Sequence, residues 1–206
     1  MALEQGAIIN VLDWAYEKAV NTKVPGLESA QSLAESYLKN DRSIHEQVDD
    51  LIFWQNTKCA TSGFLSGLGG LITLPVAVPA NVSSVIYVQL RMVAAIAHMG
   101  GHDIVDDKVK TFAYTCLCGN AAKEVFKEVG IKIGQKVTEQ AIQKVSVEII
   151  KKINSAVGFR LVTKFGQSGI VNLGKAIPIV SGLIGATFDA YSSNVVGNTA
   201  REIFIG

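Results

Sequence analysis

The sequence predicts an all-α fold, a single-domain helical bundle with a Gly-rich apolar helical hairpin at its centre. Apolar residues recur every three or four positions through most of the 206 residues, which is the spacing of a buried helix face. Only four prolines interrupt this pattern. Hydrophobic residues make up 49% of the chain and charged residues only 18%, which excludes a disordered chain. We expect one compact unit, in which N-terminal helices over residues 1–55 pack on a helical domain over residues 56–206.

The N-terminal region predicts three helices. Apolar residues between positions 8 and 20 follow helical spacing, and the Pro-Gly pair at 25–26 ends that segment. Residues 27–38 form the next short amphipathic helix. Ser43 and Glu46 then make a capping box, in which each side chain bonds an otherwise unpaired amide at the start of the third helix.

The next segment carries no charge. Residues 59–90 contain no Lys, Arg, Asp or Glu, and they are numerous enough to cross a bilayer, which takes about 20 residues. Pro75 and Pro79 each remove a backbone amide and disturb the preceding turn, so one straight helix is not expected. We expect a Gly-rich helix, a break at the prolines, and a second helix from Asn81 as N-cap to a Gly-Gly pair at 100–101.

This charge-free hairpin has two interpretations. It is either the buried centre of the bundle, with glycines that permit close packing, or an element that contacts or inserts into lipid. In the second case an acyl chain or bilayer would be bound through residues 60–90 and 178–188. The candidate lipid-contacting residues are Gly63, Phe64, Gly67, Gly69, Gly70, Pro75 and Pro79.

Past the hairpin, Asp103 or Asp106 is a good N-cap for the following helix. From Ala121 the apolar positions again step by three or four residues, with lysines off that stripe. The pattern predicts either one basic amphipathic helix or a pair interrupted at Gly130 or Gly134.

The last part of the chain predicts a turn and a closing helix. The Gln-Ser-Gly sequence at 167–169 has turn composition. Pro178 fits the first position of a helix over residues 178–204, since that position needs no amide hydrogen.

Charge is unevenly distributed although the net charge is only +1. Residues 1–56 hold nine acids against four bases, whereas residues 104–175 hold twelve bases against six acids. The basic section suits either an anionic surface or the acidic N-terminal part of the chain. Nucleic acid is not expected, because glutamates interleave with the lysines and no aromatic platform accompanies them. The candidates for binding an anionic surface are Lys123, Lys127, Lys136, Lys144, Lys151 and Lys152.

Two isolated charges stand in apolar helical segments. Arg91 is the only charged residue between Lys58 and Asp103, and Asp189 is the only one between Lys175 and Arg201. Since a buried charge is costly unless it is paired, we expect the two helices to pack side by side with Arg91 against Asp189. The alternative is that each charge reaches solvent or a backbone carbonyl at a helix end.

Catalytic chemistry has little support in the sequence. His98 and His102 are four residues apart and Asp103 follows, which could place three metal ligands together. The Gly-Gly pair between the histidines instead favours a helix end followed by an N-cap. The chain has no nucleophile elbow, phosphate-binding loop or dinucleotide motif, so we expect no cofactor and a non-enzymatic role.

The combination of these elements resembles the bacterial EcsC family. The resemblance rests on glycines at 63, 67, 69 and 70, the helix-breaking Pro75, an apolar helix ending MVAAIAHMG, and Gly101-His102-Asp103. The C-terminal IPIVSGLIGATFDAYSSNVVGNTAREIF is similar to the closing helix of the family, so most of residues 55–206 is covered. The family is named after a protein encoded beside the subunits of an ABC transporter, and the resemblance implies a helical fold without an assigned activity.

Together these observations predict a cytoplasmic protein, peripheral to the inner face of the membrane, that binds membrane lipid or another hydrophobic ligand. Two alternatives remain open. One is a soluble adaptor or regulator that docks on a membrane transporter. The other is a hydrolase or metal-dependent enzyme that uses His98, His102 and Asp103.

Overall fold

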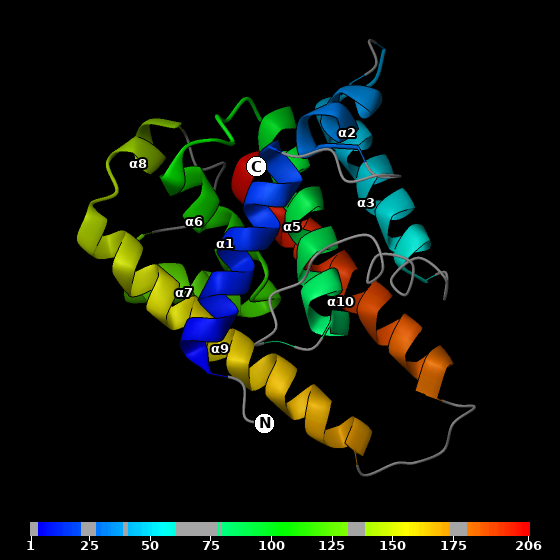
Figure 1. Ribbon diagram of the computed structural model, residues 1–206. Helices are drawn as coiled ribbons and strands as arrows, with labels where there is room; N and C mark the ends of the chain where they lie inside the picture. Colours follow the sequence, from blue (N-terminus) through cyan, green and yellow to red (C-terminus); the bar gives the residue numbers. More distant parts are fainter. Residues whose placement is uncertain are drawn as a thin grey trace.

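The part of the chain that the structure describes is helical, with no strand in it, which confirms the all-α prediction (Figure 1). The computed structural model describes residues 4–21, 28–38, 41–60, 78, 80–131, 139–173 and 181–206. Within these ranges, the side chains of residues 58–60, 80–81, 139, 166–173 and 181–191 are not described. The elements are α1 (Gln5–Asn21), α2 (Ala30–Tyr37), α3 (Ile44–Ala60), α5 (Ala80–Met99), α6 (Asp107–Cys116), a 3-10 turn (Gly119–Ala121), α7 (Ala122–Glu128), α8 (Glu139–Gln143), α9 (Val147–Leu173) and α10 (Ser181–Phe204).

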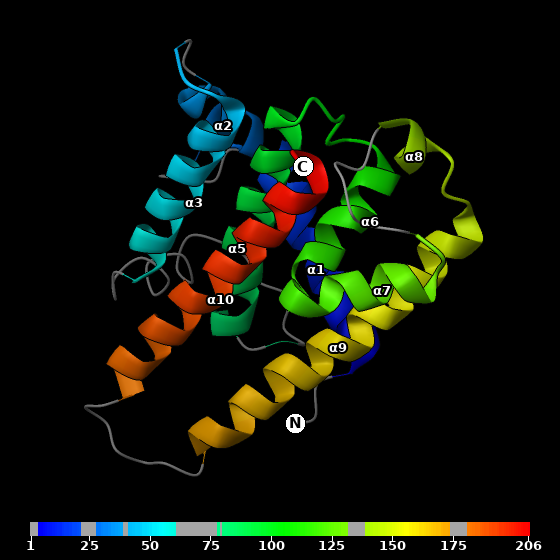
Figure 2. The ribbon, with the colours of Figure 1, turned by 180° about the vertical axis from the view of Figure 1, so that it is seen from behind.

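Helix α5 is the centre of the bundle. It contacts α1, α2, α3, α6 and α10, and every residue from 83 to 97 is buried (Figures 1 and 2). Among the described residues, Val82–Met99 is the one segment long and apolar enough to cross a membrane, and 89% of it is buried in the protein. The second half of the predicted hairpin is therefore the core helix of the bundle. It begins at Ala80, so Asn81 lies inside the helix rather than at its N-cap.

The Gly-Gly pair ends α5 as predicted. Gly101 adopts φ +85°, a left-handed conformation that glycine enters at little cost. The Gly101 amide donates to the carbonyl of His98 at 2.9 Å, and the His102 amide donates to that of Ala97 at 3.1 Å. These two bonds form a Schellman motif, which satisfies carbonyls that the helix end would otherwise leave open.

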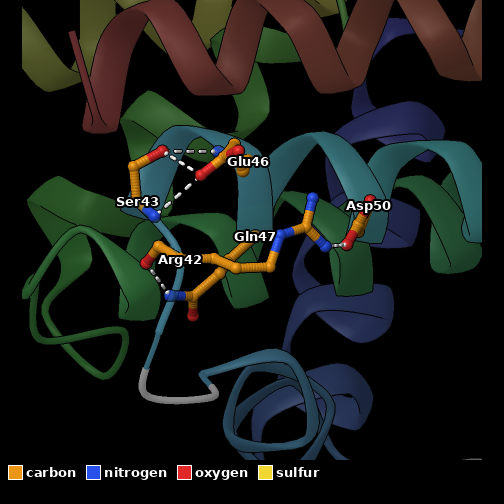
Figure 3. Close-up of polar contacts among 5 residues, drawn as sticks. All are labelled: Arg42, Ser43, Glu46, Gln47 and Asp50. Carbon is orange, nitrogen blue, oxygen red and sulfur yellow. Dashed lines mark hydrogen bonds and ion pairs between the residues drawn. The ribbon is translucent and has the colours of Figure 1, made fainter.

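The capping box predicted for Ser43 and Glu46 is present at the start of α3 (Figure 3). The backbone amide of Ser43 donates to Oε2 of Glu46 at 2.9 Å, and the backbone amide of Glu46 donates to Oγ of Ser43 at 3.3 Å. The hydroxyl of Ser43 also donates to Oε2 of Glu46 at 2.8 Å, and this bond together with the one from the Ser43 amide lowers the pKa of the Glu46 carboxyl. The Gln47 side chain further ties the helix to the preceding turn by donating to the carbonyl of Arg42 at 2.6 Å.

The basic region is a broken series of helices rather than one helix. Helix α7 ends at Glu128, and Gly130 follows it with a φ of +79°, which allows the Ile131 amide to donate to the carbonyl of Phe126 at 2.8 Å. Gly134, the other predicted interruption, lies outside the described residues.

The start of α6 confirms one of the two predicted N-caps. Asp106 is the N-cap and accepts the amide of Lys108 at 2.7 Å.

The predicted turn at residues 167–169 is wrong, because α9 continues through them to Leu173. Gln and Ser are ordinary helix residues, a single Gly costs only about 1 kcal/mol, and no proline stands between 147 and 173 to stop the helix. The closing helix α10 ends at Phe204 as predicted and begins at Ser181. Pro178, the predicted first residue, lies outside the described residues.

Candidate functional site

Helix α9 has one face in the core and one face in solvent. It packs on α1, α6 and α7, and Ile153, Val157 and Leu161 on its inner face are fully inaccessible. These residues are four apart, so the residues that lie on the opposite side of the helix are exposed. The exposed, described residues of this outward face are Glu148, Lys151, Lys152, Ser155, Phe159 and Thr163.

The outward face of α9 is positively charged. Residues 149–188 contain five bases and no acid. Arg160 pairs with Glu128, with 2.6 Å between nitrogen and oxygen, and the Lys164 ammonium donates to the Leu117 carbonyl at 3.1 Å. Lys151 and Lys152, by contrast, are exposed and have no hydrogen bond or ion pair with any described residue. With Glu148 three and four positions before them, the outward face carries two exposed lysines against one exposed glutamate, which leaves it a net charge of +1.

Phe159 places a large apolar side chain among these charges. It is 68% exposed, although the neighbouring apolar residues of α9 point into the core. Sequence analysis missed Phe159 as a candidate residue. The signal was available, because Phe159 falls off the apolar stripe that runs through Ile153, Val157 and Leu161.

The charge-free segments adjoin helix ends at one end of the bundle. The end of α9 and the start of α10 lie near each other, on the side toward which α3 ends and α5 begins (Figures 1 and 2). Lys175 follows α9, but residues 176–188, which lead into α10 and include its first residues, are uncharged, as are the residues between α3 and α5. Two apolar stretches far apart in sequence thus adjoin helix ends that point toward the same side of the bundle (Figure 1).

Most of the other predicted surface residues are scattered or not described. The predicted lipid-contacting residues from Gly63 to Pro79, and Lys136, lie outside the described residues. Lys123 pairs with Glu202 on α10 at 2.7 Å, which compensates its charge. Lys127 on α7 and Lys144 after α8 are exposed.

His98, His102 and Asp103 line one cavity of about 390 Å³. His102 is only 4% exposed, and its ring lies edge-to-face against the ring of Phe204 with centroids 5.2 Å apart. Asp103 accepts the amide of Val105 at 3.0 Å, as a residue in a turn does. Among the described side chains, no three of His, Cys, Asp and Glu form a group that could hold a metal ion. The helix end of the alternative interpretation is present here, but Asp103 lies in a turn and the N-cap of the next helix is Asp106.

Arg91 is buried, as its apolar surroundings in the sequence suggested. Its guanidinium donates to Oε1 of Gln55 at 2.9 Å and to the backbone carbonyl of Glu28 at 3.2 Å. The two helices predicted to be neighbours, α5 and α10, do pack together, and the Gln89 amide donates to Oγ of Ser193 at 3.2 Å. The side chain of Asp189 is not described, so its pairing with Arg91 stays a prediction.

Comparison with known proteins identifies the family of this chain. No curated protein and no solved structure matches the chain. The family model of the EcsC protein family matches residues 3–205. The match includes α1, α2 and α3, so the family domain extends well before residue 55, where the sequence resemblance began. Because the match covers nearly the whole chain, the protein belongs to the EcsC protein family.

Proposed function

We propose that this EcsC-family protein is a non-enzymatic, peripheral membrane protein whose outward α9 face binds the surface of an anionic bilayer. The observation that carries the proposal is the exposure of Lys151, Lys152 and Phe159 on one helix face, where the two lysines outnumber the single acid, Glu148. An interfacial helix combines these two features, since lysines attract the headgroups while an aromatic side chain enters the boundary of the acyl chains.

The expected strength of this contact is moderate. A lysine near an anionic surface contributes about 1 kcal/mol, and the contribution falls off within a Debye length. Covering one exposed phenylalanine adds about 1.5–3 kcal/mol. Two lysines and one phenylalanine therefore support reversible binding rather than permanent anchoring.

The uncharged stretches at the end of the bundle support a second, deeper contact. The apolar sequences 59–77 and 176–188 adjoin helix ends that lie on the same side of the bundle as the close of α9. Insertion of either stretch into a bilayer that meets α9 would bury apolar surface in the acyl region. The proposed ligand is therefore membrane lipid, and the same stretches would serve for a free hydrophobic ligand.

The proposed location is the cytoplasmic side of the membrane, at its inner face, because that leaflet carries anionic headgroups. A membrane transporter in the same bilayer would be a natural partner for a protein held there. No cofactor is needed for this role.

Vesicle flotation tests the proposal. The protein is mixed with neutral or anionic vesicles at low and at high salt and centrifuged in a density gradient. Flotation with anionic vesicles alone, lost at high salt, is expected if the outward face of α9 makes the contact. Flotation that resists salt indicates insertion of the uncharged stretches. Protein that stays at the bottom under all conditions overturns the membrane proposal and points to a soluble adaptor with a protein partner.

A further inference from the structure

A second site lies on the opposite side of the bundle from α9, between α2 and α3. A pocket of about 620 Å³ opens there, within the range of small-molecule sites. The lining includes the apolar side chain of Leu33 and the aromatic rings of Tyr37 and Trp54. Glu28 and Asp50 line the same space. The pocket thus combines aromatic surface with carboxylates.

The charged groups of the pocket are not equivalent. Asp50 forms an ion pair with Arg42, which stands at the start of α3 (Figure 3). Glu28 also lines the pocket and is exposed, and its carboxylate has no ion pair with any described residue. Because Arg42 compensates Asp50, Glu28 leaves the described residues of the lining with a net negative charge. This sign favours a cation over an anion.

Tyr37 lies close to both carboxylates. Burial raises the pKa of its phenol, the nearby Gln55 amide opposes the rise, and the negative charges of Asp50 and Glu28 add to it. The positive charge of Arg91 acts in the opposite direction on the pKa of Tyr37. Arg91 is buried and does not line the pocket, and its guanidinium donates to Gln55 and to the Glu28 carbonyl. A cation that entered the pocket would therefore meet an aromatic ring and carboxylate oxygens together.

We propose that the pocket between α2 and α3 binds the ammonium group of a small organic cation, with Tyr37 and Trp54 as aromatic walls and Glu28 as counter-charge. Quaternary ammonium groups are recognised by such aromatic walls, because the negative face of each ring attracts a large, weakly hydrated cation. The same chemistry is offered by a free ammonium compound and by a choline headgroup. This binding is independent of the α9 surface.

Choline is the probe for this site, and 3,3-dimethylbutan-1-ol, which has the same shape without the charge, is its control. Each is titrated into the full-length protein by calorimetry. Saturable binding of choline is expected, together with at least tenfold weaker binding of the neutral alcohol. Equal binding of the two compounds, or no binding of choline, overturns the proposal.

Variants locate the binding on the named residues. Trp54→Leu is expected to weaken choline binding about threefold or more, and Glu28→Gln by a similar factor. Val105→Ala and Glu35→Gln are the controls, because Val105 and Glu35 are exposed and do not line the pocket, whereas the ring of Phe53 packs on that of Trp54 and is left unchanged. All four positions are at the surface, so the variants should fold, and circular dichroism checks this. Unchanged binding in both pocket variants overturns the assignment.

Competition distinguishes the two sources of the ammonium group. Phosphatidylcholine vesicles that displace choline assign the pocket to a lipid headgroup, whereas vesicles that leave choline bound assign it to a free compound. Both results require choline to bind at the pocket and therefore support the proposal. Choline binding is also measured in a variant that lacks Lys151 and Lys152. If choline still binds to it, the pocket acts independently of the α9 surface, and a negative vesicle experiment leaves this proposal standing.

Discussion

The guanidinium of Arg91 on α5 donates to the side-chain oxygen of Gln55 on α3 across 2.9 Å, and both residues are buried. The same guanidinium donates to the carbonyl of Glu28, just before α2. A buried charge is tolerated only where acceptors replace its lost hydration. One cation on the central helix therefore ties together α3, α5 and the start of α2.

Replacing Gln55 by Leu tests how much its hydrogen bond with Arg91 contributes to the stability of the protein. The substitution removes an acceptor from a buried guanidinium, and hydrogen bonds to charged groups contribute about 1.5–3 kcal/mol. We expect the free energy of unfolding to fall by that amount in urea denaturation. Gln31→Leu on the exposed side of α2 is the control and should change stability by less than about 0.5 kcal/mol. Similar losses in both variants would contradict a special role of Gln55.

Close packing of α3 on α10 depends on Gly197. A Cβ atom at this position would lie 2.9 Å from Cγ1 and 3.0 Å from Cγ2 of Ile52. Gly197→Ala should therefore destabilise the protein by about 1–3 kcal/mol through overpacking. Gly6→Ala on α1 is the control, since nothing lies within 4 Å of its Cβ position, and it should be neutral or slightly stabilising.

A double-mutant cycle isolates the contact of Gly197 with Ile52. If the added methyl group collides with the isoleucine, Ile52→Ala should relieve part of the cost of Gly197→Ala, so the losses of stability should not add. Thermal or urea unfolding of the four proteins measures this. Strict additivity would show that the added methyl group is accommodated elsewhere.

The N-cap of α6 gives a pH-dependent prediction. Burial opposes ionisation of Asp106, but hydrogen bonds from Gln143 and from the Lys108 amide outweigh it and lower its pKa below the ordinary 3.8. A lowered folded-state pKa adds stability that is present above pH 3.8 and is lost as pH falls through the folded value. Asp106→Ala should cost about 1 kcal/mol near neutral pH and less in acid.

Urea denaturation near pH 7 and near pH 3 measures this difference. Asp106→Asn is the useful companion variant, because its side-chain oxygen can still accept the Lys108 amide but cannot ionise. It should lose less stability than Asp106→Ala at neutral pH and should show no pH dependence from this position. An equal cost of Asp106→Ala at both pH values would contradict the assigned role of its carboxylate.

The outward face of α9 can be tested residue by residue. Lys151→Gln and Lys152→Gln should each weaken flotation with anionic vesicles about fivefold, corresponding to about 1 kcal/mol per charge. Lys123→Gln is the matched control and should change binding less than about twofold, because Glu202 already compensates this lysine. Phe159→Ser should reduce the part of the binding that survives high salt. If Lys123→Gln weakens flotation as much as Lys151→Gln does, binding depends on net charge alone.

The two cysteines near the end of α6 should be chemically inert in the folded protein. Burial raises the pKa of Cys118 to about 12, although Lys164 and Arg160 oppose the rise, and burial likewise raises the pKa of Cys116. Since the thiolate is the reactive form, neither should react with iodoacetamide near pH 8 until the protein is denatured. Peptide mass mapping before and after addition of urea measures this, and rapid labelling of folded Cys118 would contradict it.

Local signals in the sequence predicted helix ends well. The capping box of Ser43 and Glu46, the N-cap Asp106 and the Gly-Gly end of α5 all involve hydrogen bonds between residues a few positions apart. Because both partners of such a bond lie close together in the sequence, a local pattern is enough to predict it. The same local reasoning failed at residues 167–169, because turn composition without a proline does not prevent a helix from continuing.

The sequence by itself determined the helical class and the charge asymmetry, since these depend on composition and on the period of apolar residues. Only the tertiary structure decided that α5 is the core helix and that Gln55 and the Glu28 carbonyl are acceptors for Arg91. The acceptors of Arg91 lie 36 and 63 positions away from it along the chain. A long-range contact forms only when the whole packing of helices repays the entropy of closing the chain between its partners, and no local pattern encodes that balance.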